Sequence, residues 1–140
     1  ERSFIIEKFK QYNYSLSLFA QAELFLEMNK LDSAILVIDQ AIKRVEGTGF
    51  EEYLILSKIR TLSRYFLYNK SEELAKTFLE RFPKSIYCEE IIFLLGYSQY
   101  QQQKNIEAIN TFVDLLTKYP RSIFNPRARL IINELRKKES

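Results

Sequence analysis

A seven-residue phrase occurs twice in the chain, and this repetition constrains the fold more than any other feature. Residues 81–87 read RFPKSIY and residues 118–124 read KYPRSIF, 37 positions later. Pro, Ser and Ile are identical, and the other positions exchange one basic or aromatic residue for another. Self-similarity at a fixed period of about 20–50 residues is typical of arrays in which one supersecondary unit stacks on the next.

The repeat extends beyond this phrase, because a shift of 37 positions aligns three copies of a longer segment. Small side chains coincide at Ala34, Ser71 and Ala108, and aromatic side chains at Phe50, Tyr87 and Phe124. In the first copy, apolar residues recur at steps of three and four, the spacing of one helix face. Only three Gly and three Pro occur, which favours long helices over a sheet with many turns.

Each copy is predicted to form two antiparallel helices joined by a short turn. The first helices are expected at about 15–28, 51–67 and 88–102. The second helices are expected from Leu31 to Gly47, from the Asn69–Ser71 region to Phe82, and at about 106–118. Either Asn69 or Ser71 is a candidate cap for the middle one, and Asn125 for a last helix that begins at Pro126. The joining turns are expected near Asn29-Lys30, Asn69-Lys70 and Lys104-Asn105.

The predicted fold class is all-α, an α-solenoid of three helix pairs with terminal helices. We expect a single domain over residues 1–140, with an N-terminal helical segment at 1–14 and repeats at about 15–50, 51–87 and 88–124. A C-terminal helix is expected at about 126–138. The sequence leaves open whether the helix predicted at residues 2–12 continues through Asn13-Tyr14-Ser15.

The composition argues against catalysis. The chain has no His and a single cysteine, Cys88, which removes the commonest general base, the usual triads and cysteine-based zinc sites. The pairs Glu51-Glu52, Glu72-Glu73 and Glu89-Glu90 all lie near predicted helix starts. We interpret them as favourable charges at the positive helix end rather than catalytic carboxylates. No enzymatic activity, cofactor or metal site is therefore expected.

The charge balance is mildly basic, with a net charge of +3. That value is too small to indicate a nucleic-acid partner. The final RKKES is interpreted as a solvated helix end, with a membrane-surface or nucleic-acid role as the alternative. No apolar run is long enough to span a bilayer.

The segment LGYSQYQQQKNIEAINTFVDLLTKYP resembles a tetratricopeptide repeat (TPR). Gly96, Ala108, Phe112 and Pro120 stand at the family's positions 8, 20, 24 and 32. Ala22, Ala34, Ile38 and Ala41 match positions 8, 20, 24 and 27 of an earlier copy. The middle copy departs from the family, because Ile59 replaces the small residue at position 8 and Ser71 stands for the Ala at position 20. The resemblance covers about residues 15–124 and implies a TPR-like scaffold.

The period of 37 and the aromatic-Pro-basic-Ser phrase resemble the long TPRs of bacterial envelope lipoproteins. Examples serve the outer-membrane β-barrel assembly machine and the Tol–Pal system. This resemblance implies a periplasmic or outer-membrane-associated protein, with a cytoplasmic one as the alternative. It also implies a role in a cell-envelope complex.

In TPR proteins the first helix of each pair lines a concave groove that binds a partner protein or peptide. Carried over residue by residue, this implies partner contacts at Phe19, Tyr53, Leu56, Arg60, Arg64, Phe93, Tyr97 and Tyr100. These types suit a segment with apolar side chains and some carboxylates. The family's clamp for acidic C-terminal peptides is not expected, because Phe19 and Glu23 replace its Lys and Asn. Alternatively, a terminal helix covers the groove.

The predicted function is thus a non-catalytic protein–protein interaction scaffold. Two alternatives remain open at this point. One is a structural module that self-associates through exposed helix faces. The other is a regulatory domain of a larger protein whose active part lies outside this sequence.

Overall fold

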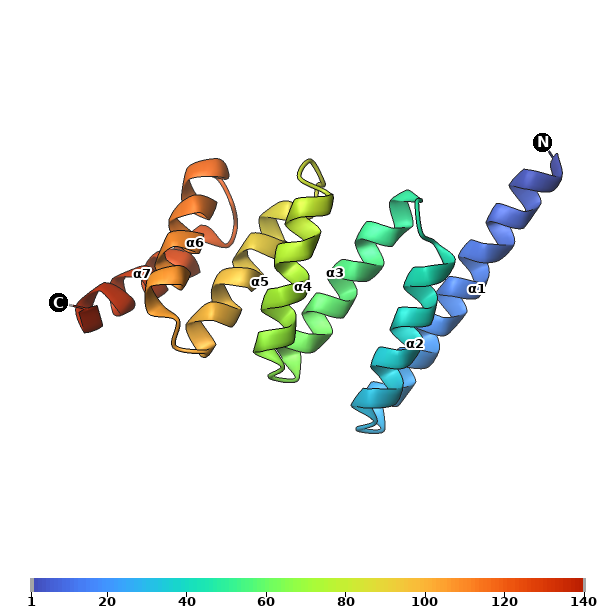
Figure 1. Cartoon of the computed structure of the whole chain (residues 1–140), viewed down its shortest axis with the longest axis horizontal. Coiled ribbons are helices and arrows are strands. Elements are labelled where there is room, and N and C mark those ends of the chain that lie inside the picture. The colour runs from blue at the N-terminus through green and yellow to red at the C-terminus, as the bar shows by residue number, and fades with distance from the viewer. Residues whose placement is uncertain (1, 140) are drawn as a thin grey trace. The chain divides into compact units, whose positions relative to one another are not determined.

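A computed structural model of the chain describes residues 2–139, and for residues 2–5, 8, 9 and 139 it describes the backbone alone. Helix is the only regular secondary structure in this range (Figure 1). The helices are α1 (Arg2–Glu27), α2 (Leu31–Arg44), α3 (Gly49–Arg64), α4 (Tyr68–Arg81), α5 (Cys88–Gln101), α6 (Asn105–Lys118) and α7 (Asn125–Glu139). The prediction of an all-α, TPR-like fold is confirmed.

The chain divides into two compact units, Glu1–Lys58 and Ile59–Ser140. In the first unit α1 and α2 pack along each other as an antiparallel pair (Figure 1). The hydroxyl of Ser15, which is fully buried, joins them by donating to the carbonyl oxygen of Ala41 at 2.8 Å. Since α1 runs unbroken through residues 13–15, the N-terminal segment and the first helix of the first repeat are one helix.

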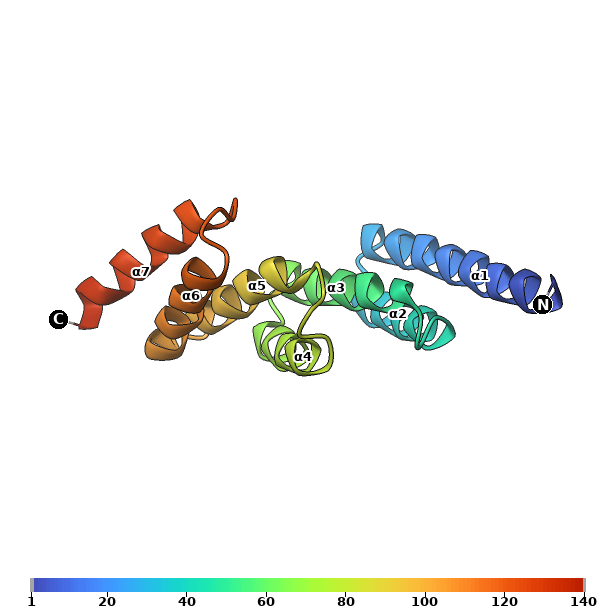
Figure 2. The same ribbon diagram turned by 90° about the horizontal axis from the view of Figure 1, so that it is seen from above.

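In the second unit each of the helices α4 to α7 packs against the next. Figure 2 shows α4 below α5, and α7 above α6, so that α5 and α7 form one layer and α4 and α6 the other. The core lies between these layers and includes Ile92, Ala108, Phe112, Leu115 and Leu135, each at most 5% exposed. Burial of these apolar side chains is the main force that holds the helices together.

Three turns between paired helices have the same backbone, and they too are 37 residues apart. Asn29, Phe66 and Gln103 adopt left-handed conformations, with φ of 58°, 67° and 64°. The next residue in each turn donates its N–H to a carbonyl five residues earlier, as in Leu67 to Leu62 at 2.8 Å. This hydrogen bond closes a Schellman motif, which satisfies carbonyls at a helix end.

The middle turn lies earlier than predicted, which corrects the proposed caps. α4 begins at Tyr68, so Asn69 and Ser71 lie inside the helix and the residue before it, Leu67, makes no side-chain cap. The backbone hydrogen bonds of the Schellman turn fix the helix start without a capping side chain. Ser71 instead accepts a hydrogen bond from the Ser98 hydroxyl at 3.1 Å, where α4 meets α5.

The repeated phrase forms two loops with matching hydrogen bonds. The N–H of Ser85 donates to the Phe82 carbonyl, and that of Ser122 to the Tyr119 carbonyl, at 3.1 and 3.0 Å. Each Ser hydroxyl accepts the N–H two residues later at 3.1 Å. Asn125 is the first residue of α7, and its Nδ2 donates to the Tyr119 carbonyl at 2.8 Å. It thus fastens the loop, rather than capping α7 as predicted.

Candidate functional site

The residues of the first unit that were predicted to contact a partner lie largely in the interior of that unit. Phe19 and Tyr53 are half-buried and pack against a cluster formed by Ala41, Val45 and Leu54. Leu56 is fully buried. The expectation that Leu56 faces a partner is therefore corrected, because its side chain has no surface to offer.

Arg60 and Arg64, predicted as neighbouring cations, occupy different surroundings in the second unit. The Arg60 guanidinium donates to both carboxylate oxygens of Glu90, each at 2.6 Å, and so joins α3 to α5. This fork-to-fork geometry engages the Arg60 guanidinium in a contact within the protein. Arg64 is exposed, with its guanidinium carbon 5.7 Å from the centre of the Tyr65 ring.

The predicted aromatic residues of α5 lie under α7. Phe93 is only 4% exposed and stacks on Phe124 with ring centres 4.9 Å apart, so the expectation of an exposed Phe93 is also corrected. Tyr97 is half-buried, and the guanidinium carbon of Arg127 stands 4.9 Å from its ring centre. The Tyr100 hydroxyl donates to a carboxylate oxygen of Glu134 at 3.0 Å. The final helix thus covers part of this face, as the alternative anticipated.

An aromatic surface continues from α5 to the turn before α4, where the sequence analysis placed no contact. Phe66 is 75% exposed, and its ring lies 6.2 Å from that of Tyr68, centre to centre. The ring of Tyr68 meets that of Tyr97 at 6.0 Å, and Tyr97 meets Tyr100 at 6.1 Å. These four residues are called the aromatic surface below. A left-handed conformation is sterically costly for Phe, and Gly or Asn usually occupies it, so no sequence signal pointed to Phe66.

The phenols of Tyr68 and Tyr100 remain protonated across the physiological range. Burial raises the pKa of Tyr68, and the neighbouring Tyr97 raises it further. Burial also raises the pKa of Tyr100, and the carboxylate of Glu134 adds to the effect. Both groups are therefore neutral hydrogen-bonding groups on apolar rings, a combination common in protein interfaces.

Glu72 is the centre of a buried polar network that was interpreted from sequence as a simple helix-start charge. Its side chain is 5% exposed, and Lys104 and Lys76 approach its two oxygens at 2.9 and 3.1 Å. Gln102 and Gln99 donate to the same carboxylate at 2.9 and 3.3 Å. Burial alone would raise the pKa of Glu72, but these hydrogen bonds outweigh it and lower the pKa to about 2. A pocket of about 270 Å³ adjoins the network, whose carboxylate is already satisfied.

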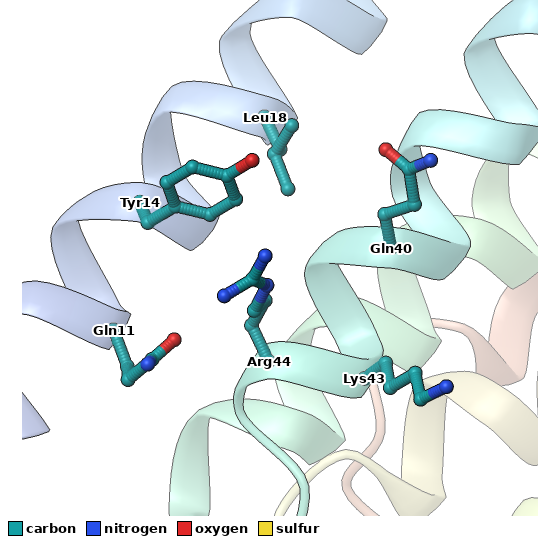
Figure 3. A pocket seen from close by; sticks show the side chains of 6 residues that line it. All are labelled: Gln11, Tyr14, Leu18, Gln40, Lys43 and Arg44. Carbon is teal, nitrogen blue, oxygen red and sulfur yellow. The ribbon is translucent and has the colours of Figure 1, made fainter.

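A second hollow, of about 700 Å³, opens between α1 and α2. Figure 3 shows the Arg44 guanidinium pointing toward Tyr14, and its carbon lies 4.4 Å from the ring centre. Gln11, Leu18, Gln40 and Lys43 complete the lining. The cation–π contact already engages Arg44 and helps to hold the two helices together.

Residues singled out for possible chemistry have structural roles. Cys88 is buried, and its thiol donates to the Phe82 carbonyl at 3.2 Å. One member of each glutamate pair is engaged within the protein: Glu51 accepts the Gly47 N–H at 3.0 Å, and Glu72 and Glu90 make the contacts described above. Among side chains that the structure describes, no group of three or more acidic or cysteine residues is arranged to hold a metal ion.

The family comparison agrees with this helical architecture. A family model described as outer membrane lipoprotein, YfiO, matches residues 13–138, nearly the whole chain. The chain belongs to the YfiO family. This confirms the resemblance to TPR-type envelope lipoproteins and the expected periplasmic or outer-membrane association.

The YfiO family is a family of non-catalytic scaffolds, which gives the chain a protein-interaction role in the outer-membrane envelope. Membership of this family implies that the partners are proteins of outer-membrane assembly. A comparison with curated proteins found no match. Of the helices in residues 2–139, none has both the length and the apolar character needed to cross a bilayer.

Proposed function

We propose that this YfiO family member is a non-catalytic scaffold that binds a segment of a partner protein on the aromatic surface of its second unit. The observation that carries the proposal is the strained and exposed Phe66. A left-handed backbone costs about 1–2 kcal/mol at a residue other than Gly. The chain bears this cost at a position where the ring is 75% exposed and contributes little to the core. Strain kept at an exposed aromatic side chain is a reason to assign it a binding role.

The surroundings of Phe66 support the same conclusion. Tyr68, Tyr97 and Tyr100 extend the ring contacts over α4 and α5, and each of the three is only half-buried. Clustered aromatic residues with nearby arginines are the composition typical of interface hot spots. Of the originally predicted contacts, the proposal keeps Arg64, Tyr97 and Tyr100, while Phe19 and Tyr53 have no part in it.

The charges define the chemistry of the partner segment. Arg64 and Arg127 are exposed and each lies over an aromatic ring. A partner with apolar side chains and one or two carboxylates would bury the rings and pair with these guanidinium groups. The aromatic contacts would supply most of the affinity. The arginines would orient the segment and make association dependent on salt.

The experiment begins with photo-crosslinking in the native envelope. A photoreactive phenylalanine analogue placed at Tyr68 should give one major adduct with another protein. The same analogue at Leu36, which is 61% exposed on α2, should not. A self-adduct would indicate the alternative, a self-associating module. Purification of the crosslinked partner then permits titration calorimetry.

Three variants test the binding site. Phe66→Gly and Phe66→Ala should each weaken binding by about 1–3 kcal/mol, as for loss of an aromatic anchor. Only the Gly variant should also raise the melting midpoint, because Ala retains the backbone strain. Arg64→Glu should weaken binding and reduce its salt dependence, whereas Lys43→Glu on α2 should not. Wild-type affinity in both Phe66 variants would overturn the proposed site.

A further inference from the structure

The two loops formed by the repeated phrase expose one large aliphatic side chain each. Ile86 is 85% exposed and Ile123 is 84% exposed, more than any other large hydrophobic residue that the structure describes in this chain. Ile ranks among the residues most often found buried in folded proteins. Neither side chain contributes appreciably to the core, so packing does not account for them.

The loops hold these side chains in the same way. Matching hydrogen bonds from Ser85 and Ser122 set the backbone on either side of each Ile. The side-chain groups of Cys88 and Asn125, 37 residues apart, both donate to the carbonyl at the start of their loop. The two loops therefore share one hydrogen-bonding arrangement.

Both loops project from the same edge of the second unit (Figure 1). They follow the carboxyl ends of α4 and α6, which both run antiparallel to α5. Each loop also presents an exposed basic residue, Lys84 or Arg121, two positions before its Ile. Residues 81–87 and 118–124 together contain four basic residues and no acidic one.

This arrangement suits a lipid surface better than a protein groove. A protein hot spot is a contiguous, densely packed cluster of side chains, whereas here two single aliphatic side chains stand on separate loops. A bilayer interface is a deformable plane that accepts separate apolar side chains, with basic residues held at the level of anionic headgroups. The family places this chain at the outer membrane, so such a surface is near.

We propose that Ile86 and Ile123, with Lys84 and Arg121, form a membrane-contact edge that rests on a bilayer containing anionic phospholipid. The loop at the equivalent position of the first unit provides an internal contrast. Residues 44–50 read RVEGTGF, so Glu and Gly replace the Pro and basic residue, and Gly49 replaces the Ile. The edge is thus a property of the second unit alone and is separate from the aromatic surface.

Fluorescence offers a direct test, because the chain contains no Trp. In Ile86→Trp and Ile123→Trp, phosphatidylglycerol vesicles should shift the emission to shorter wavelength, and bromine on the lipid acyl chains should quench it. Ile106→Trp is the matched control, since Ile106 is 64% exposed at the start of α6, away from both loops. No shift at either loop, or an equal shift at Ile106, would overturn the proposal.

Vesicle sedimentation of the full chain tests the energetic contribution. The double variant Ile86→Asn/Ile123→Asn should lower the partition coefficient on phosphatidylglycerol roughly tenfold or more, with an unchanged melting midpoint. Lys84→Gln/Arg121→Gln should reduce binding and its salt dependence, and phosphatidylcholine vesicles should bind weakly. Phe66→Gly should leave vesicle binding unchanged, which separates this proposal from the partner site. Wild-type partitioning of the double Asn variant would refute the membrane-contact edge.

Discussion

Gly96 on α5 lies against the ring of Phe112 on α6 so closely that a Cβ at Gly96 would stand 2.6 Å from Cε1 of that ring. Phe112 is fully buried in the core of the second unit and has little room to move. Gly96→Ala should therefore lower the free energy of unfolding by about 1–3 kcal/mol through overpacking. Thermal unfolding followed by circular dichroism provides the measurement.

Gly49→Ala is the matched control for this prediction. A Cβ at Gly49 would meet no atom within 4 Å, and the residue begins α3. Ala there should be neutral or slightly stabilising. If Gly96→Ala melts at the wild-type temperature, the close approach of α5 and α6 is wrong.

Glu72 should give the chain a distinctive acid sensitivity. Its pKa falls from about 4.5 in the unfolded chain to about 2 in the folded protein, so it stabilises the fold fully above pH 4.5 and loses this contribution as the pH falls toward 2. The shift corresponds to a contribution on the order of 3 kcal/mol at neutral pH. Denaturant titrations of wild type and Glu72→Gln should differ most above pH 5 and converge near pH 2. A difference independent of pH would contradict this role.

Phe66→Gly should make the protein more stable. Gly adopts the left-handed conformation without steric cost, which favours the variant by about 0.5–1 kcal/mol after its larger unfolded-state entropy is allowed for. The exposed ring has little packing to lose. Phe66→Ala keeps a Cβ in the same conformation and should bring no gain. Equal stability of the two variants in urea would show that strain at residue 66 is negligible.

The ion pair of Arg60 and Glu90 should stabilise the fold less than its bidentate geometry suggests. Its side chains are 46% and 25% exposed, so solvent screens the pair and a coupling of about 0.5–1 kcal/mol is expected. A double-mutant cycle with Arg60→Ala and Glu90→Ala measures it. Arg60→Lys should lose most of the coupling, because an ammonium group cannot reproduce the two-pronged contact. A coupling that survives this change would rule out the bidentate arrangement.

The repeat period and the ends of several helices were predictable from the sequence, because both depend on local residue spacing and residue type. The apolar spacing and the Pro residues indicated α2, α5 and α6 to within a few positions. The middle turn was misplaced because Asn69 carries a strong turn signal, whereas the left-handed residue is Phe66, whose type disfavours that backbone. Backbone hydrogen bonds of the Schellman motif, such as that from the Leu67 N–H to the Leu62 carbonyl at 2.8 Å, close the turn although the residue type disfavours it.

The candidate site was only partly predictable. The repeat register predicts which helix face a residue occupies, but it does not predict which other elements cover that face. Phe93 occupies the expected face, yet Phe124 and α7 bury it. Glu72 looked like its neighbour Glu73 in sequence, but its donors Gln102 and Lys104 come from 30 or more residues away. Such long-range partners leave no trace in local spacing.

The network around Glu72 has a consequence for how the protein opens. Hydrogen bonds run from Glu72 on α4 to Gln99 on α5, and from Gln99 to Thr111 on α6. Separating α4 from α5 would leave the buried carboxylate short of donors, and separating α6 from α5 would leave the Gln99 amide oxygen without the Thr111 hydroxyl, which is costly in both cases. Helical repeat arrays can unravel one unit at a time, but α4, α5 and α6 should instead exchange their amide hydrogens together, as one cooperative block.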